Sequence, residues 1–168
     1  MIGQGHEIKA IETEGMWLDA VYPWDSLGLN AAILGQVQAK SGGTIEAGVS
    51  VKGPVSIGRG TVIRSNSYLA GPMVIGDGCE IGPNVCLFPA TSIGNNVVIS
   101  SFTEVKNSVI GNDVNIGSGS IIHDTVIDNG CVIKGQFTAS SGQEEVTVEH
   151  EHHLVNVGAM SVSYTHLR

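Results

Sequence analysis

One aliphatic residue recurs at every sixth position through the middle of the chain, and this repeat limits the fold more than any other feature. The run has eleven members without a miss, and chance alone would give such a run on the order of once per million registers at ordinary composition. Its members are Ile45, Val51, Ile57, Ile63, Leu69, Ile75, Ile81, Leu87, Ile93, Ile99 and Val105. The fourth residue after each is nearly always small or β-branched, and only Met73 is large. The repeat therefore predicts that each unit of six residues forms one short strand and one corner.

A second period, of 18 residues, indicates how these units assemble. Gly58, Gly76 and Gly94 are 18 residues apart, and we expect them at corners, where the chain needs backbone freedom. Three units then make one coil of a triangular prism. Successive coils start at Ile45, Ile63, Ile81, Ile99, Ile116 and Ile133. Coils stack about 4.8 Å apart, so that each backbone amide pairs with a neighbouring coil.

Two coils are one residue short at the same place, within residues 105–109 and 122–126, which indicates a local feature on that edge. The composition, 42% hydrophobic with only 5% aromatic residues and 23 glycines, suits an aliphatic core with many tight turns. We expect residues 42–141 to form an all-β parallel β-helix whose interior is continuous from about residue 45 to 133. The three cysteines form no C-x-x-C pair, and at least two fill small core positions, so no disulfide framework is implied.

The pattern aliphatic-Gly-x-x-small-x resembles that of the left-handed parallel β-helix transferases. The resemblance, and not the period, implies a left-handed prism, because crossovers between parallel strands are otherwise right-handed in about 98% of cases. It also implies that the prisms pack side by side as homotrimers. In that family acyl-CoA lies in the crevice between neighbouring subunits.

The segment before the repeat resembles a different kind of domain. The string WLDAVYPWDSLGLN, at residues 17–30, resembles the closing motif of sugar-1-phosphate nucleotidylyltransferase domains, with a YPWD linker of the archaeal type. Residues 1–41 would then be the tail end of such a domain and its linker helix. The helix should begin near Pro23. We expect its packed face to contain Trp24, Leu27, Ala31 and Leu34.

The same resemblance implies that Asp19 helps to hold the catalytic Mg²⁺ of the nucleotidylyltransferase. The alternative is that Asp19 is a cap or surface acid and that Trp17 and Trp24 only pack. A lone carboxylate cannot organise Mg²⁺ and two phosphates, because that chemistry needs several converging charges. We therefore expect nucleotidyl transfer to require a domain upstream of residue 1, and this chain alone to be largely inactive.

The string FTEVKN, at residues 102–107, resembles the F-x-E-x-K-x motif in the acetyltransferase domain of bifunctional N-acetylglucosamine-1-phosphate uridylyltransferases. In that family a catalytic His follows the Lys by about a dozen residues and precedes a Gly-Asp pair. Carried over by position, Asp124 matches the Asp of that pair. Ser118 stands where the family has its His, which is a departure from the pattern.

His123 is the only histidine in the coils and is the candidate base, since acetyl transfer to an amine needs a group that takes a proton. Lys106 holds the equivalent position one coil earlier. Together with Asn107 and Asp124 it would bind an anionic ligand such as a sugar phosphate or acyl-CoA. Adjacent strand residues point to opposite sides, so Asp124 is not expected to orient His123 directly. The alternative for all four is a solvated face.

Beyond the coils, residues 142–160 predict a β-hairpin excursion and a return to the prism. Its His150, His152 and His153 could bind a transition metal, but alternation along a strand favours a solvated strand. Residues 161–168 end in a string that resembles the translation of a transposon-end sequencing adapter, and we expect this tail to be non-native.

Net charge, the lack of a long apolar segment and the number of histidines argue against several functions. Sixteen acidic against eight basic residues, a formal charge of −8, disfavour nucleic acid and anionic membrane as partners. No long apolar segment or signal pattern is present, which predicts a cytoplasmic protein. A γ-type carbonic anhydrase would need three His ligands. We expect part of a sugar-1-phosphate nucleotidylyltransferase/N-acetyltransferase that uses acetyl-CoA. The alternative is a non-catalytic trimerising scaffold for an upstream nucleotidylyltransferase domain.

Overall fold

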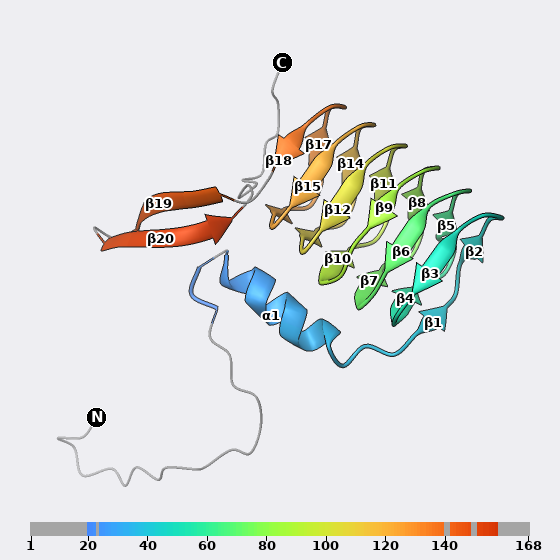
Figure 1. The fold of residues 1–168 in the computed structure, drawn as a ribbon, viewed down its shortest axis with the longest axis horizontal. Coiled ribbons are helices and arrows are strands. Elements are labelled where there is room, and N and C mark those ends of the chain that lie inside the picture. Colours follow the sequence, from blue (N-terminus) through green and yellow to red (C-terminus); the bar gives the residue numbers. More distant parts are fainter. Residues whose placement is uncertain (1–19, 23, 140–141, 149–150, 158–168) are drawn as a thin grey trace, which may run out of the picture.

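Three parallel sheets of six strands each form the walls of a prism (Figure 1). The structure is a computed structural model and describes residues 20–22, 24–139, 142–148 and 151–157. Sheet A contains β1 (Lys40–Ser41), β4 (Val55–Ile57), β7 (Met73–Ile75), β10 (Thr91–Ile93), β13 (Val109–Ile110) and β16 (Val126–Ile127). Sheet B contains β2 (Thr44–Ile45), β5 (Val62–Ile63), β8 (Glu80–Ile81), β11 (Val98–Ile99), β14 (Asn115–Ile116) and β17 (Val132–Ile133). Sheet C contains β3 (Ser50–Lys52), β6 (Tyr68–Ala70), β9 (Cys86–Leu87), β12 (Glu104–Lys106), β15 (Ile121–His123) and β18 (Thr138–Ala139).

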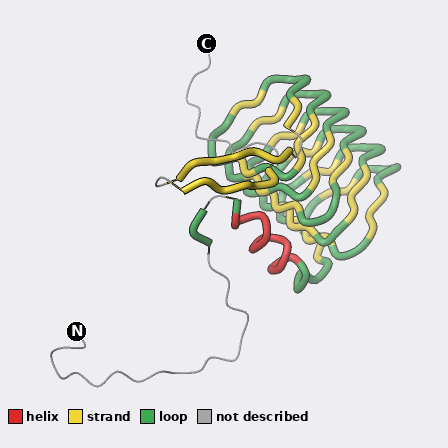
Figure 2. The backbone as a smooth tube through the Cα atoms, turned by 60° about the vertical axis from the view of Figure 1, so that its left-hand side comes forward, coloured by secondary structure: helices red, strands yellow, loops and turns green. Residues whose placement is uncertain are grey.

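The chain visits sheets A, B and C in turn, so each coil adds one strand to each sheet (Figure 2). Because side chains alternate along a strand, the repeated aliphatic residues point inwards and their neighbours outwards. Ile63, Leu69, Ile81, Leu87 and Ile99 are all 0% exposed. The small or β-branched positions are mostly buried too, including Cys79 and Cys131, and none of the three cysteines forms a disulfide bond. The predicted parallel β-helix is confirmed.

The first coil departs from the prediction. Ile45 is 41% exposed and Val51 is 42% exposed, so placing both in the interior was wrong. Among the described residues no further coil covers the outer side of this coil, and stacking buries its side chains from one side only. The buried interior runs from Val55 to Cys131, and Val49 and Ile133 are partly buried against it.

The corner glycines are needed for a reason other than the predicted backbone freedom. Gly58, Gly76 and Gly94 do not have a left-handed φ. A Cβ on any of them would lie 2.4–2.7 Å from the backbone of the next coil. Left-handed φ angles occur instead two positions later, at residues such as Gly78 (+69°) and Asn96 (+56°). Close packing between coils, rather than backbone freedom, therefore requires these glycines.

An asparagine ladder uses the space that these glycines leave at the edge between sheets A and B. The Asp77 backbone N–H donates to Asn95 Oδ1 at 2.8 Å, and the Asn95 N–H donates to Asn112 Oδ1 at 2.8 Å. The Asn112 N–H donates in turn to Asn129 Oδ1 at 2.6 Å. Each asparagine side chain thus accepts a hydrogen bond from a corner N–H group of the preceding coil. Without it, that backbone donor would lack a protein partner.

Helix α1 (Asp25–Leu34) lies along sheet A, where it contacts β10 and β13 (Figure 1). Its docking is polar as well as apolar: Asn30 Nδ2 donates to the Ala90 carbonyl at 2.7 Å, and Ser92 Oγ donates to Asn30 Oδ1. Before the helix, Asp25 Oδ2 accepts the backbone N–H groups of Val21 and Tyr22 at 3.0 and 2.9 Å. This carboxylate fixes the turn into the first helical residue.

The expected helix is present, but its predicted packed face is only partly correct. Leu27 and Leu34 are buried, as predicted. Ala31 is exposed, so its place on that face was wrong. Asn30, not Ala31, lies against sheet A, because its side-chain amide hydrogen-bonds to the Ala90 carbonyl and to Ser92. Trp24 is half-buried, and its ring stacks on Tyr22 with centroids 4.6 Å apart.

Strands β19 (Gly142–Val148) and β20 (Glu151–Val157) form an antiparallel hairpin beside the last coils (Figure 1). His152 and His153 lie on β20, while His150, residues 158–160 and residues 161–168 lie outside the described residues. Within the described part of the chain, no group of three His, Cys, Asp or Glu side chains could hold a metal ion. No helix described here is long and apolar enough to cross a membrane.

The exposure gradient along the stack predicts unequal costs for the same truncation. Ile81→Ala removes a side chain packed between the coils of Ile63 and Ile99, and should lower the free energy of unfolding by about 2–5 kcal/mol. Ile45→Ala, at a 41% exposed position, should cost less than half as much. Denaturant unfolding of both variants measures the difference. Equal losses would contradict the exposed first coil.

Two ion pairs of Arg64 join the first three coils at the edge between sheets B and C. Arg64 contacts Glu46 at 2.9 Å and Glu80 at 2.8 Å. Glu46 Oε2 also accepts the hydroxyl of Ser65 at 2.8 Å and its backbone N–H at 2.9 Å. The hydrogen bonds from Ser65, followed by those from Arg64, hold the pKa of Glu46 below its ordinary value of 4.5.

This pKa predicts a pH-dependent stability difference. A carboxylate with a lowered folded-state pKa stabilises the fold above its unfolded pKa, and the contribution is lost as pH falls through the folded value. Glu46→Gln should therefore lower the melting temperature at pH 6–7. The gap to the unaltered protein should shrink below about pH 4.5. A gap that stays constant from pH 7 to 3 would show that the charge of Glu46 contributes nothing.

Candidate functional site

The corner between sheets C and A tightens where the candidate residues lie. Strands β7 and β10 pair Val74 with Ser92, a spacing of 18, whereas β10 and β13 pair Ser92 with Val109, a spacing of 17. Ala90, Asn107 and Asp124 all have a left-handed φ, of 62°, 44° and 51°, and hold the same corner position in successive coils. The residue equivalent to Pro89 is therefore the one missing from both short coils.

The shortened corners place Lys106 and His123 directly before the turn. These two residues pair in register on β12 and β15, as the sequence predicted. Buried hydroxyls hold the backbone below them: Ser108 Oγ donates to the Lys106 carbonyl and Thr125 Oγ1 to the His123 carbonyl, both at 2.7 Å. Both candidate side chains are thus carried on a backbone that is hydrogen-bonded from inside.

Asn107 and Asp124 are partners of each other. Asn107 Nδ2 donates to Asp124 Oδ1 at 2.6 Å across the two coils. Asn and Asp tolerate the left-handed conformation better than most residues, so both suit this corner. This bond turns Asp124 towards Asn107 and away from a role as the partner of His123.

The partner of His123 is Glu104, which the sequence reasoning missed. His123 Nε2 lies 2.8 Å from Glu104 Oε1. A carboxylate only accepts, so Nε2 carries the proton in the neutral ring, and Nδ1 is left with a free lone pair. No other described side chain bonds the imidazole. The side chains are 24% and 41% exposed, so the pair is accessible and stabilises the fold little.

Glu104 lies on the outward face of β12, two residues before Lys106, and pairs in register with Ile121. It reaches His123 diagonally across the two strands. The sequence signal for this contact is the alternation that places residues 104 and 106 on one face. The three outward side chains Glu104, Lys106 and His123 thus form one cluster, which we call the sheet C cluster.

Ser118 lies apart from this cluster. It lines a shallow pocket of about 400 Å³ at the edge between sheets B and C, together with Phe102, Gly119, Gly135 and Gln136. Ser118 is at the corner before β15, whereas His123 ends that strand. The position that the resemblance assigns to a catalytic His therefore faces this pocket, which we call the edge pocket.

Phe102 is an unusual wall for the edge pocket. It has a φ of +60° and is 70% exposed. In four other coils the same corner position holds Gly or Asn, which adopt this conformation easily, namely Gly48, Asn66, Asn84 and Gly119, and in the last coil it holds Gln136. An aromatic side chain here is strained and unprotected, which indicates a role outside the folding of this chain.

Several large apolar side chains near the edge pocket are exposed. The exposed large side chains of this region are Val98 (36%), Phe102 (70%), Ile121 (39%), Val132 (74%) and Phe137 (40%). They come from the last three coils and from both sheets B and C. A cluster of this kind is typical of a surface that another molecule covers. Asp19, the predicted Mg²⁺ ligand, lies outside the described residues.

Comparison with known proteins agrees with the repeat and the fold. The family model of the GMPPB C-terminal domain matches residues 69–162, more than half of the chain. This chain belongs to the GMPPB C-terminal domain family. The matched residues include all of the sheet C cluster and the edge pocket.

Curated relatives of this GMPPB C-terminal domain are longer, bifunctional proteins. The chain is 40% identical over 125 residues to the bifunctional protein GlmU of Methanocaldococcus jannaschii, covering 74% of the chain and 31% of that protein. It is 34% identical over 167 residues to the bifunctional sugar-1-phosphate nucleotidylyltransferase/acetyltransferase of Sulfurisphaera tokodaii, covering 87% and 41%. The chain thus spans well under half the length of these relatives.

A solved structure with the same fold is a variant of the perosamine N-acetyltransferase of Caulobacter crescentus, in complex with CoA and GDP-perosamine. The TM-score is 0.54 at 19% identity, over 68% of this chain and 59% of that one. At this identity the likeness shows the fold of the GMPPB C-terminal domain and does not transfer that enzyme's ligands.

Proposed function

We propose that this chain is the acyl-transfer part of a sugar-1-phosphate nucleotidylyltransferase/acetyltransferase and that His123 is its general base. The observation that carries the proposal is the His123–Glu104 contact of 2.8 Å, which leaves Nδ1 free to take a proton. Lys106, one coil earlier, provides an exposed positive charge for a phosphate. The names of the longer relatives support this function.

The roles of the side chains follow from their geometry. His123 Nδ1 is placed to take the proton that an amino-sugar acceptor loses as its nitrogen acquires the acyl group. The Glu104 carboxylate orients the ring and stabilises the imidazolium that forms. Lys106 holds the sugar phosphate, and the Asn107–Asp124 bond fixes the corner beside it. Acyl-CoA, when bound, would supply the thioester; its C–S bond would break as the amide forms, and the CoA thiolate would leave and take up the proton held by His123.

The edge pocket has the chemistry to hold acyl-CoA. Gly119 and Gly135 leave backbone exposed for hydrogen bonds, Gln136 adds an amide, and Phe102 adds an apolar wall. This suits a thin chain with alternating amide and methylene groups. The pocket and His123 lie at opposite ends of β15, which spans roughly 10 Å at about 3.3 Å per residue.

The exposed apolar side chains around the edge pocket suggest how the site is completed. We propose that a second copy of the chain covers them in a homotrimer, so that the edge pocket becomes a crevice between subunits. The proposed Mg²⁺ chemistry, with Asp19, belongs to the nucleotidylyltransferase part. We place the protein in the cytoplasm, because its three cysteines form no disulfide bond and acyl-CoA is its proposed substrate.

One observation favours a second candidate function. Ser118, and not an imidazole, lines the edge pocket. A prism that has lost acyl transfer would still trimerise and hold an upstream nucleotidylyltransferase domain in place. The two functions differ in a single measurable property, because a scaffold consumes no acetyl-CoA.

Acetyl-CoA consumption by the full-length protein with glucosamine 1-phosphate tests the proposal. His123→Ala should lower kcat by about 10²–10⁴-fold through loss of the base. Glu104→Gln should lower it less, because the ring stays but loses its charged partner. Lys106→Ala should mainly raise KM for the sugar phosphate.

Arg59→Ala is the matched control, because it removes an exposed cation at the edge between sheets A and B, away from the sheet C cluster and the edge pocket. It should leave kcat and KM unchanged. Turnover that survives His123→Ala would remove His123 from the mechanism. Absence of turnover by the unaltered protein with every amino sugar phosphate would favour the scaffold.

A further inference from the structure

An aromatic pair lies on the outer face of sheet C, on the coils before the sheet C cluster. The rings of Tyr68 and Phe88 have centroids 6.0 Å apart and are tilted by 55°. Lys52 Nζ lies 5.7 Å from the centre of the Tyr68 ring. Both aromatic side chains are only half-buried, so part of each remains open to solvent. Neither ring has a role in the acyl-transfer mechanism proposed above.

The register joins this aromatic pair to the candidate base. The Phe88 backbone N–H donates to the Val105 carbonyl, which places Phe88 one coil before Lys106. Lys106 pairs in turn with His123. At about 4.8 Å per coil, Phe88 and His123 are roughly 10 Å apart along the face. An aromatic ring, a cation and an imidazole therefore follow one another in a row.

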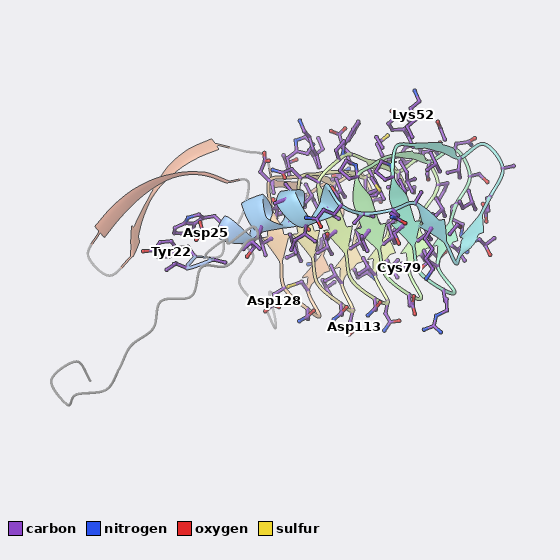
Figure 3. All side chains as sticks on the ribbon, turned by 90° about the horizontal axis from the view of Figure 1, so that it is seen from below. Tyr22, Asp25, Lys52, Cys79, Asp113 and Asp128 are labelled. Atoms are coloured by element: carbon purple, nitrogen blue, oxygen red, sulfur yellow. The ribbon has the colours of Figure 1, made fainter. Side chains whose placement is uncertain are left out.

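The charges of this face differ from those of the chain as a whole. Arg59 and Arg64 are paired with carboxylates, but no described carboxylate lies within 4.0 Å of the ammonium of Lys52 or Lys106. Glu104 is the one acid among the described outward residues of sheet C, and it contacts His123. Figure 3 shows Lys52 on the opposite side of the prism from Asp113 and Asp128.

We propose that this face binds a nucleoside diphosphate, with its base on Tyr68 and Phe88 and its diphosphate at Lys106. A group attached to the diphosphate would then reach His123. This inference rests on the proposed function for its last step only, in which a nucleotide-linked amino sugar would be an acceptor in addition to the sugar phosphate. Base stacking on exposed aromatic rings of a sheet is a general mode of nucleotide binding. Lys106 is exposed and has no described carboxylate within 4.0 Å, so its ammonium is available to a diphosphate.

Calorimetric titration of the 168-residue chain tests the inference. The probes are UDP, GDP and inorganic pyrophosphate. The unaltered chain should bind at least one nucleoside diphosphate about tenfold or more tightly than pyrophosphate, because only the nucleotides carry a base that can stack. Phe88→Leu and Tyr68→Leu should each remove most of that advantage and leave pyrophosphate binding unchanged. Lys106→Ala should weaken all three.

Two controls separate stacking from loss of structure. Tyr68→Phe keeps the ring and should keep nucleotide affinity. Tyr22→Leu removes an aromatic ring beside helix α1, away from sheet C (Figure 3), and should also bind normally. Thermal melting followed by circular dichroism shows whether each variant is folded.

Equal affinity for pyrophosphate and both nucleotides, no binding of either nucleotide, or unchanged affinity in a folded Phe88→Leu variant would overturn the inference. Tighter binding of single-stranded RNA than of a nucleoside diphosphate would also overturn it. The proposed function fails separately. Nucleotide binding without acetyl transfer refutes only acyl transfer, and turnover of glucosamine 1-phosphate without nucleotide binding refutes only this inference.

Discussion

Apolar contact between one coil and the next is the interaction on which the rest of this structure depends. Each coil is too short to bury its own aliphatic side chains, and it becomes part of a core only when another coil covers it. Ile81, with a coil on each side, is 0% exposed, whereas Ile45 in the first coil is 41% exposed. The close approach also dictates glycine at Gly58 and Gly76, where a Cβ would meet the next coil's backbone.

The same stacking places the chemistry. Register between parallel strands puts side chains of equivalent position above one another, so Lys106 and His123 are neighbours although 17 residues separate them. The loss of one residue at the C–A corner changes the spacing without breaking the strands, since Asn107 and Asp124 close the shorter turn together. The prism thus holds an exposed polar cluster on a backbone supported by its interior.

The fold was predictable from the sequence because one six-residue period determines both the strands and the corners. The same period predicted that Lys106 lies beside His123 in the preceding coil. The contact with Glu104 was not predicted, because it runs diagonally and depends on where two long side chains meet. The exposure of Ala31 depends on how helix α1 docks through Asn30, which periodicity within the helix does not encode. The exposure of Val51 in the first coil was not predicted either, because it depends on whether anything covers the outer side of that coil.

Amide hydrogen exchange, measured strand by strand, tests the central claim of coil-on-coil stacking most directly. Nearest-neighbour stacking predicts the slowest exchange in the middle strands, β8, β11 and β12, which have a coil on each side. It predicts faster exchange in β2 and β3 of the first coil, where Ile45 and Val51 are exposed. Uniform protection from the first coil to the last, or fastest exchange in the middle strands, would contradict the account.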